Sequence, residues 1–492
     1  MGIIKKQSIQ GSIFLYLGVF IGFITTSILF PRILSEEEIG LLNTLIAYSV
    51  VFAQFGTLGF NSAIIRMFTY FRNPKNNHNG FFSLVLAVII FGSIVSIILF
   101  FIFKSYIIQE NIENSPLFVK YIYYLLPLIF FTIVFYLIDT YYTVLYHAVR
   151  GLFLKEFIQR ILILIVLIIY YLQIINVDSF IIGYVISLSI PSVIIVIWLI
   201  YDKEFVIKPN FGFITKDLRK TIFNVSFFGI LAGIAGNSIT QIDKAMSSSM
   251  ISLHVTGIYS TVVVFALLIK VPSRAVLKIS MPIIADAWKN NDIESIKKVY
   301  ISSSLNQFII AALVFIGIWA NIDNIFRILP SGYEEGKYVI FYIGLAFVIE
   351  MATGVNNTII ASSKYYKYLT WFSLIMLVLV VVTNLIFIPL WQINGVAFAS
   401  AITLVIFTFI KVLFIYLKFK IHPFNNKFIL VVIVSLLAYF ASDFIPYLNN
   451  LYADIIIRSG LITLIFGVLT LWFKISDDVN NSYNKIINKL KF

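Results

Sequence analysis

Several basic side chains lie inside or at the ends of long apolar stretches of this chain, where a charge is costly. They are Arg32, Arg66, Lys244, Lys270 and Arg274. Such cations usually face a cavity rather than lipid, and a guanidinium suits phosphate because its planar fork donates two hydrogen bonds at once. Their chemistry would be the binding of an anion. The alternative for Arg32, Arg66 and Arg274 is that they reach out to head groups, and for Lys244 that it pairs with its neighbour Asp243.

Lys270 and Arg274 are spaced so that they could act together. On one unbroken helix, residues four apart share a face. Pro272 lies between them, removes a backbone hydrogen bond and favours a bend there. The sequence therefore predicts a kink beside two cations. Lys411 is flanked by further cations, and we expect it to extend to the head groups.

Three acidic residues also fall inside apolar stretches: Asp139, Asp243 and Glu350. A buried carboxylate can have its pKa raised enough to exchange protons, so these are candidates for ion coupling, with Glu350 nearest to the middle of its stretch. The alternative is a structural hydrogen bond or a pairing with a nearby cation. We expect no cofactor, only possible coupling of transport to H+ or Na+.

Other chemistry finds little support in the sequence. The chain has no Cys and only four His, which argues against thiolate or His-rich metal sites. No phosphate-cradling glycine loop, zinc-protease helix or nucleophile elbow is present. We therefore assign no catalytic residue and no metal ligand. The net charge of +13 fits loops facing anionic lipid, and we expect no nucleic-acid partner.

The elements that must position these residues are membrane-spanning helices. The chain is 60% hydrophobic and 12% charged, and Tyr368 to Ile410 contains no charged residue. Because about 20 apolar residues cross a bilayer, this run predicts two spans with a turn at Pro389–Gly395. Similar runs predict an all-α polytopic protein with about 14 spans, at residues 11–31, 39–62, 81–103, 121–146, 157–175, 179–201, 221–243, 254–278, 301–322, 338–360, 368–388, 394–416, 428–446 and 455–474.

The distribution of basic residues supports this count. Cytoplasmic loops carry an excess of Lys and Arg. With a cytoplasmic N-terminus, most of the 36 Lys and Arg fall on that side. The outer segments hold only Arg32, Lys104, Lys120, Arg327, Lys337 and Arg458. We therefore expect a multi-pass cytoplasmic-membrane protein with both termini inside. A long inner loop, 282–299, could be an interfacial amphipathic helix.

The domain organisation follows from the loop near the midpoint of the chain. We expect an N-terminal lobe at 1–201, a cytoplasmic linker at 202–220, a C-terminal lobe at 221–416, and two further spans with a tail at 417–492. Two segments each follow a polar outer turn and put a Gly at the start of a span: Glu38-Ile39-Gly40-Leu41-Leu42-Asn43-Thr44 and Val255-Thr256-Gly257-Ile258-Tyr259-Ser260-Thr261. This faint repeat favours two pseudo-symmetric six-helix lobes, as is usual in transporters.

Three segments resemble the polysaccharide flippases of the multidrug/oligosaccharidyl-lipid/polysaccharide exporter superfamily. The first is the outer turn Phe30-Pro31-Arg32-Ile33-Leu34-Ser35-Glu36-Glu37-Glu38-Ile39-Gly40-Leu41, and the second is Phe55-Gly56-Thr57-Leu58-Gly59-Phe60-Asn61-Ser62-Ala63-Ile64-Ile65-Arg66. The third, Asn384 to Ser400, is similar to that family's IP-x-x-G-x-x-G-A-A-x-A turn and keeps Gly395 and Ala397. The resemblance covers essentially the whole chain.

The resemblance implies a two-lobed transporter that flips undecaprenyl-diphosphate-linked oligosaccharide repeat units across the cytoplasmic membrane by alternating access. The product would feed O-antigen lipopolysaccharide, capsule or exopolysaccharide synthesis, with a polymerase and glycosyltransferases as possible pathway partners. In that family spans one, two, seven and eight line the cavity, so Lys270, Arg274 and Arg66 are expected to bind the diphosphate from inside. Arg32 and Lys244 would meet it from outside.

Two readings within the superfamily stay open. A multidrug exporter would expel cations by H+ or Na+ antiport and would favour an acidic cavity, whereas the excess here is cationic. A lipid II flippase carries the same undecaprenyl diphosphate, and the sequence separates it poorly from a repeat-unit flippase. A membrane-embedded polymerase or ligase is the alternative from another class, and the absence of a long outer loop from the predicted topology argues against it.

Overall fold

The computed structural model describes residues 2–210, 212–237 and 239–490. Every regular element in this part of the chain is helical, which confirms the all-α class. Nine of these helices are long and apolar enough to span a membrane, or ten if the bent pair Tyr333–Met351 and Asn356–Ser362 forms one span.

The predicted count of about 14 spans exceeds these nine or ten helices, and shorter, less apolar or merged helices lie at the remaining predicted spans. Tyr368–Phe419 is a single element of 52 residues that is interrupted at Gln392 and holds two predicted spans. Gln159–Tyr171 and Lys427–Asp443 coincide with predicted spans but have only 13 and 17 residues. Lys216–Asn237 is of sufficient length but is much less apolar. The fold is therefore that of a polytopic membrane protein.

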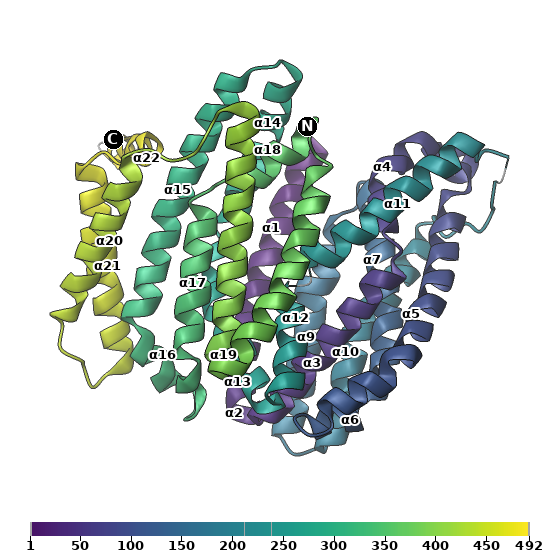
Figure 1. Ribbon diagram of the computed structural model, residues 1–492, viewed down its shortest axis with the longest axis horizontal. Helices are drawn as coiled ribbons and strands as arrows, with labels where there is room; N and C mark the ends of the chain where they lie inside the picture. The colour runs from purple at the N-terminus through teal and green to yellow at the C-terminus, as the bar shows by residue number, and fades with distance from the viewer. Residues whose placement is uncertain (1, 211, 238, 491–492) are drawn as a thin grey trace. The chain divides into compact units, whose positions relative to one another are not determined.

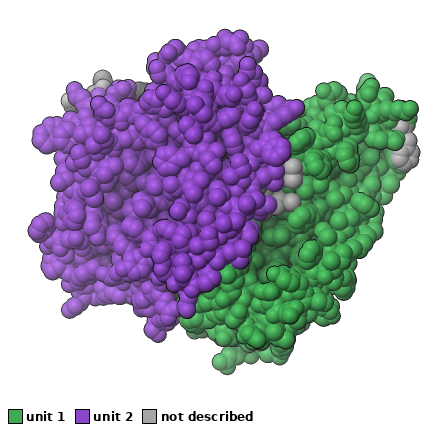
Figure 2. Space-filling view, viewed as in Figure 1, with its two compact units in different colours: residues 1–260 green, residues 261–492 purple. Residues whose placement is uncertain are grey.

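Contacts divide the chain into two compact units, residues 1–260 and 261–492, coloured separately in Figure 2. The first unit contains α1 (Gly2–Phe23), α2 (Phe30–Ile33), α3 (Glu36–Gly56), α4 (Phe60–Phe71), α5 (Phe81–Asn111), α6 (Pro116–Lys120), α7 (Leu125–Val144), α8 (Val149–Leu152), α9 (Gln159–Tyr171), α10 (Val177–Tyr201), α11 (Lys216–Asn237), α12 (Ile239–Met250) and the start of α13 (Leu253–Leu267). Thus α11 and α12 pack with the N-terminal helices. The lobe boundaries at 201 and 221 stay a prediction.

The second unit holds the rest of the chain. Its helices are α14 (Ser273–Lys289), α15 (Ile293–Ala320), α16 (Ile322–Ile328), α17 (Lys337–Met351), α18 (Asn356–Ser362), α19 (Tyr368–Phe419), α20 (Lys427–Asp443), α21 (Leu451–Trp472) and α22 (Asp477–Leu490). Figure 1 shows α20 and α21 side by side, and both contact α15.

The predicted turn at Pro389–Gly395 is present inside α19. Gln392 has a positive φ of 48°, which interrupts the helix. The hydroxyls of Thr383 and Thr403, on either side of that point, lie 3.0 Å apart. A Cβ on Gly395 would lie 2.0 Å from the carbonyl oxygen of Phe387. The two halves of α19 therefore fold back on each other as a hairpin, which requires glycine where the backbones meet.

The second predicted span is broken near its end, between Gly56 and Phe60. Ser35 caps α3 through a capping box, in which its backbone N–H donates to Glu38 and the Glu38 N–H donates to its hydroxyl. The helix ends at Gly56, and α4 starts after Gly59, which has a φ of 66°. A Cβ there would lie 2.1 Å from the Ser226 carbonyl oxygen of α11. Gly59 thus permits both the turn and the close approach of α4 to α11.

The faint repeat has a structural counterpart. A Cβ on Gly40 would lie 1.9 Å from the carbonyl oxygen of Leu253, at the start of α13. A Cβ on Gly257 would lie 2.0 Å from the carbonyl oxygen of Glu36, at the start of α3. Each glycine of the repeat thus lets the other repeat's helix approach its backbone. The same residue type is needed at both positions because the contact is reciprocal.

The predicted kink at Pro272 is confirmed, and it separates two helices. α13 ends in a short 3-10 turn, Leu268–Lys270, and α14 begins at Ser273. The interfacial helix expected within 282–299 is not a separate element. Its residues belong to the end of α14 and the start of α15, joined at Asn290–Asp292. The mixture of apolar and polar residues in 282–299 therefore comes from the ends of two long helices and not from a helix lying in the membrane interface.

Candidate functional site

Lys270 and Glu350 form an ion pair in the second unit. The Lys270 Nζ lies 2.7 Å from the Glu350 Oε2 and 4.7 Å from the centroid of the Phe347 ring. The 3-10 turn after α13 positions the lysine, and the last turn of α17 positions the glutamate. Both side chains stay partly exposed, 34% and 24%. Pairing offsets the cost of placing two charges among apolar helices. The residual exposure leaves both side chains accessible to an ion or a ligand.

Lys411 is a third charged residue of this group. We expected it to extend to the head groups, but its side chain is only 3% exposed within α19. Its ammonium lies 4.2 Å from the centroid of the Phe407 ring and interacts electrostatically with both Glu350 and Lys270. The expectation was wrong because burial here depends on helices packed around α19. When all three groups are ionised, the cluster carries one net positive charge.

Lys244 lies on α12 in the first unit. Its ammonium donates a hydrogen bond of 2.8 Å to the amide oxygen of Asn43 on α3, and the Asn43 amide donates to the Ile39 carbonyl. The neighbouring carboxylate of Asp243 is buried and accepts a hydrogen bond from the Tyr259 hydroxyl, 3.1 Å away. The hydrogen-bond partner that positions the Lys244 ammonium is thus a neutral amide.

The other predicted cations, Arg32, Arg66 and Arg274, lie on α2, α4 and α14. Arg32 on α2 and Arg66 on α4 have exposed side chains, and both interact with their surroundings. Arg274 begins α14, but its side chain lies outside what the structure describes. The predicted shared face of Lys270 and Arg274 required an unbroken helix, and the helix is broken between them.

Asp139 on α7 is closely packed against α8. A Cβ on Gly151 would lie 1.7 Å from its Oδ1, and that oxygen is buried without a hydrogen-bond partner among the described residues. Lys155 interacts with it electrostatically. The described contacts of Asp139 are therefore with residues of the N-terminal helices.

The sequence did not identify Asn43 as the partner of Lys244, or Arg458 and Asp454 as a buried ion pair. Asn43 lies three residues after Gly40, so the repeat could have pointed to it. Arg458 was counted as an outer-loop cation, but its side chain is 2% exposed, and it pairs with Asp454 at 3.2 Å. It also donates to the Ser442 carbonyl at 2.8 Å. This pair joins α20 to α21 and has a structural role.

Comparison with known proteins relates the chain to a family. A model of the family described as "Polysaccharide biosynthesis protein" matches residues 8–288. A search of curated proteins finds no match.

Among solved structures, the chain is similar to "Lipid II flippase MurJ, inward closed conformation", with a TM-score of 0.74, 16% identity, and coverage of 94% of this chain and 98% of that one. It is also similar to the inward-facing conformation of a multidrug resistance MATE family transporter of the MOP superfamily (TM-score 0.58, 15% identity, 83% and 94% covered). A third is the MATE multidrug transporter DinF-BH (TM-score 0.56, 14% identity, 85% and 95% covered).

At identities this low, the structural similarity shows that the chain shares the fold of these transporters and flippases. The family match covers more than half of the sequence. Together with the apolar helices, these findings describe a multi-pass membrane protein. The chain belongs to the polysaccharide biosynthesis protein family.

Proposed function

We propose that this protein is a flippase that moves undecaprenyl-diphosphate-linked oligosaccharide repeat units across the cytoplasmic membrane by alternating access. The observation that carries the proposal is the positive charge left over in the group formed by Lys270, Glu350 and Lys411. A diphosphate cannot cross hydrocarbon as an anion, so its path needs cations that are not fully neutralised. Family membership supports a role in polysaccharide synthesis.

Lys244 adds to this proposal from the first unit. The Lys244 ammonium is hydrogen-bonded to a neutral amide and interacts electrostatically with the Asp243 carboxylate, so an incoming phosphate would compete with that carboxylate for its charge. We propose that Lys270 and Arg274 contact the diphosphate in one state and Lys244 in the other, with Arg32 and Arg66 reached at the two ends of the path. A polymerase and glycosyltransferases of the same pathway are the partners we propose.

Glu350 is the residue we propose for ion coupling. When its carboxylate takes up H+ or exchanges its partner for Na+, Lys270 is released from the 2.7 Å ion pair and can bind the diphosphate. Asp139, which is closely packed against Gly151, and Asp243, which accepts a hydrogen bond from the Tyr259 hydroxyl, are the weaker candidates.

A lipid II flippase is a second candidate, favoured by the similarity of the fold to such a protein over 94% of this chain. A multidrug exporter is less well supported, because a net positive group repels cationic drugs. The test is flipping in liposomes with three cargoes: a fluorescent undecaprenyl-diphosphate oligosaccharide, lipid II and an organic cation. Flipping of the first alone supports the proposal, and an imposed H+ or Na+ gradient tests coupling in the same vesicles. Movement of only the cation would overturn the proposal.

A further inference from the structure

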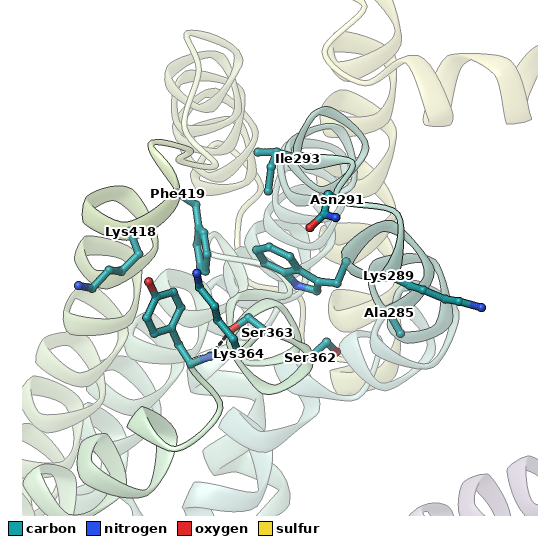
Figure 3. Close-up of a pocket in the computed structure, with 11 residues that line it drawn as sticks. Ala285, Lys289, Asn291, Ile293, Ser362, Ser363, Lys364, Lys418 and Phe419 are labelled. Carbon is teal, nitrogen blue, oxygen red and sulfur yellow. Dashed lines mark hydrogen bonds between the residues drawn. The ribbon is translucent and has the colours of Figure 1, made fainter.

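A cavity of about 580 Å3 opens in the second unit, at one end of its helices. It lies where α14, α18 and α19 end and α15 begins. Figure 3 shows the residues that line it. The charge pattern of the sequence assigns this end to the cytoplasm. Its volume falls within the range of about 300–1,000 Å3 typical of small-molecule sites.

The charges around this cavity are all positive. Lys289, Lys364 and Lys418 line it, and no lining residue is acidic. Among the described residues, none of these three lysines makes an ion pair, whereas nearby lysines such as Lys297 and Lys427 do. Asp286 and Asp292 each lie three residues from Lys289 along the chain, and among the described residues neither forms an ion pair with these lysines. Asp292 accepts hydrogen bonds from the Ser295 N–H and hydroxyl instead. The cavity therefore presents cations without a built-in counter-ion.

Aromatic rings form the walls of the cavity and hold one another in place. The Trp288 and Phe419 ring centroids are 4.8 Å apart, and those of Tyr365 and Phe419 are 5.7 Å apart. The Trp288 indole N–H donates to the Ile359 carbonyl at 3.1 Å. Such a set of packed rings gives a preformed wall.

Two of the lysines lie close to the same ring. The ammonium groups of Lys364 and Lys418 are 5.3 and 5.5 Å from the Tyr365 ring centroid. In Figure 3, Lys364 rises beside Phe419, whereas Lys289 and Lys418 extend outward on opposite sides. Their flexible stems allow the ammonium groups to turn toward a bound anion. Such an anion would relieve the repulsion between the Lys364 and Lys418 ammonium groups, which lie near the same Tyr365 ring.

A simpler explanation accounts for only part of this arrangement. Cations stabilise the negative ends of helices, and Lys289 and Lys418 lie in the last turns of α14 and α19. That role needs no cavity. It also does not explain Lys364, which lies beyond the end of α18, or the aromatic walls between the lysines.

We infer that this cavity binds a phosphate group, held by Lys364, Lys418 and Lys289 against the Trp288 and Tyr365 rings. Two sources share this chemistry: the head group of an anionic phospholipid, and a soluble phosphoester. Basic pockets at the cytoplasmic ends of membrane helices commonly bind anionic head groups. The inference does not depend on the proposed function, since no lining residue is among those assigned to the transported diphosphate.

The test uses the full-length protein in nanodiscs of phosphatidylcholine, with or without phosphatidylglycerol. Native mass spectrometry counts retained phosphatidylglycerol, and calorimetry follows glycerol 3-phosphate as the soluble probe. The variant Lys364→Gln/Lys418→Gln is compared with Lys367→Gln/Lys420→Asn, which removes two charges from neighbouring positions that do not line the cavity. The Lys420 position has a φ of 57°, which Asn tolerates.

We expect binding of one probe to weaken roughly ten-fold or more in the first variant and to stay near wild type in the second. Loss for phosphatidylglycerol identifies a phospholipid site, and loss for glycerol 3-phosphate a soluble-ligand site. The variant Lys364→Arg/Lys418→Arg should retain binding, which excludes misfolding as the cause. Equal weakening in both neutralised variants, or no binding of either probe by the wild type, would overturn the inference.

Discussion

Lys411 illustrates how a single charged residue can serve function at the expense of stability. A charge buried in a low-dielectric environment is costly even when a partner lies nearby. Lys411 is 3% exposed, and it interacts electrostatically with the Glu350 carboxylate, which forms its ion pair with Lys270. A group with two cations and one anion is therefore less stable than an apolar replacement would be. We attribute its presence to the anionic cargo.

The substitution Lys411→Met tests this argument. Because Met has a similar length and no charge, we expect the thermal unfolding temperature to stay equal or rise by a few degrees. The rate of flipping should fall several-fold. Thermal unfolding in detergent and flipping in liposomes provide the two readouts. A clear loss of stability with unchanged flipping would show that Lys411 has a structural role only.

The sequence identified most of these charged residues but not their partners. Lys270, Glu350 and Lys244 stood out because charges are rare in apolar stretches. The pairing of Lys270 with Glu350 joins residues 80 positions apart, which spacing cannot predict. Arg458 and Lys411 were misplaced for the same reason, since a charge near the end of a run looks the same whether it reaches solvent or a neighbouring helix.

At the scale of helices, glycines determine where backbones meet. Gly40 and Gly257 each face a carbonyl oxygen of the other repeat's helix at a distance that leaves no room for a methyl group. Gly317 and Gly467 also lie inside helices, but a Cβ there would have no neighbour within 4 Å. Comparing Gly40 and Gly257 with Gly317 and Gly467 therefore separates the steric cost of an added methyl group from the effect of Ala on helix propensity.

We predict that Gly40→Ala and Gly257→Ala each lower the unfolding temperature by several degrees, because a backbone must move to make room. Gly317→Ala should be neutral or stabilising, since Ala favours a helix over Gly by about 1 kcal/mol. Thermal unfolding of the three purified variants measures this. If all three behaved alike, the reciprocal contact between α3 and α13 would have no energetic importance.

The helix α22 is attached to α15 through a carboxylate. The Asp478 side chain accepts hydrogen bonds from the Ser302 hydroxyl at 2.6 Å and the Asn306 amide at 2.7 Å. These bonds lower the pKa of Asp478 below its ordinary value of 3.8. A lowered pKa in the folded state stabilises this attachment above the ordinary value, and the stabilisation is lost as the pH falls through the lowered one.

A spin label at Asn481→Cys should therefore be immobile at neutral pH and gain mobility only below about pH 4. In the Asp478→Asn background its mobility should not change with pH, because no carboxylate is left to titrate. Electron paramagnetic resonance spectra from pH 7 to 3 provide the measurement. The same transition in both backgrounds would assign it to another group.

The sequence also predicted the main breaks in the helices where a residue type forces them. The hairpin in α19 followed from a charge-free run with Pro389 and Gly395, and the break after α13 followed from Pro272. The turn at Gly59 was missed because Thr57-Leu58-Gly59 lies within an apolar run. There the positive φ depends on the close approach of α11, which no local pattern reveals.

For the whole molecule, the positive-inside pattern predicts which helix ends face the cytoplasm. The chain contains no Cys, so single cysteines can be introduced directly. We predict that a membrane-impermeant maleimide labels Ser331→Cys and Asn449→Cys in intact cells. Asn290→Cys and Asn425→Cys should react only after the membrane is permeabilised. All four positions are exposed, so access decides the result. The reverse pattern would invert the topology and place the phosphate cavity outside.

The central claim is that cations of both units carry a lipid-linked diphosphate across the membrane. The most direct measurement is the flipping rate of a fluorescent undecaprenyl-diphosphate oligosaccharide in liposomes that contain wild type, Lys270→Ala, Lys244→Ala or Lys337→Ala. Lys337 is the control, because its 3.1 Å ion pair with Asp323 is solvent-exposed. We predict at least a ten-fold loss for the first two variants, correctly folded, and wild-type rates for the control. Unchanged flipping in Lys270→Ala and Lys244→Ala would contradict the claim.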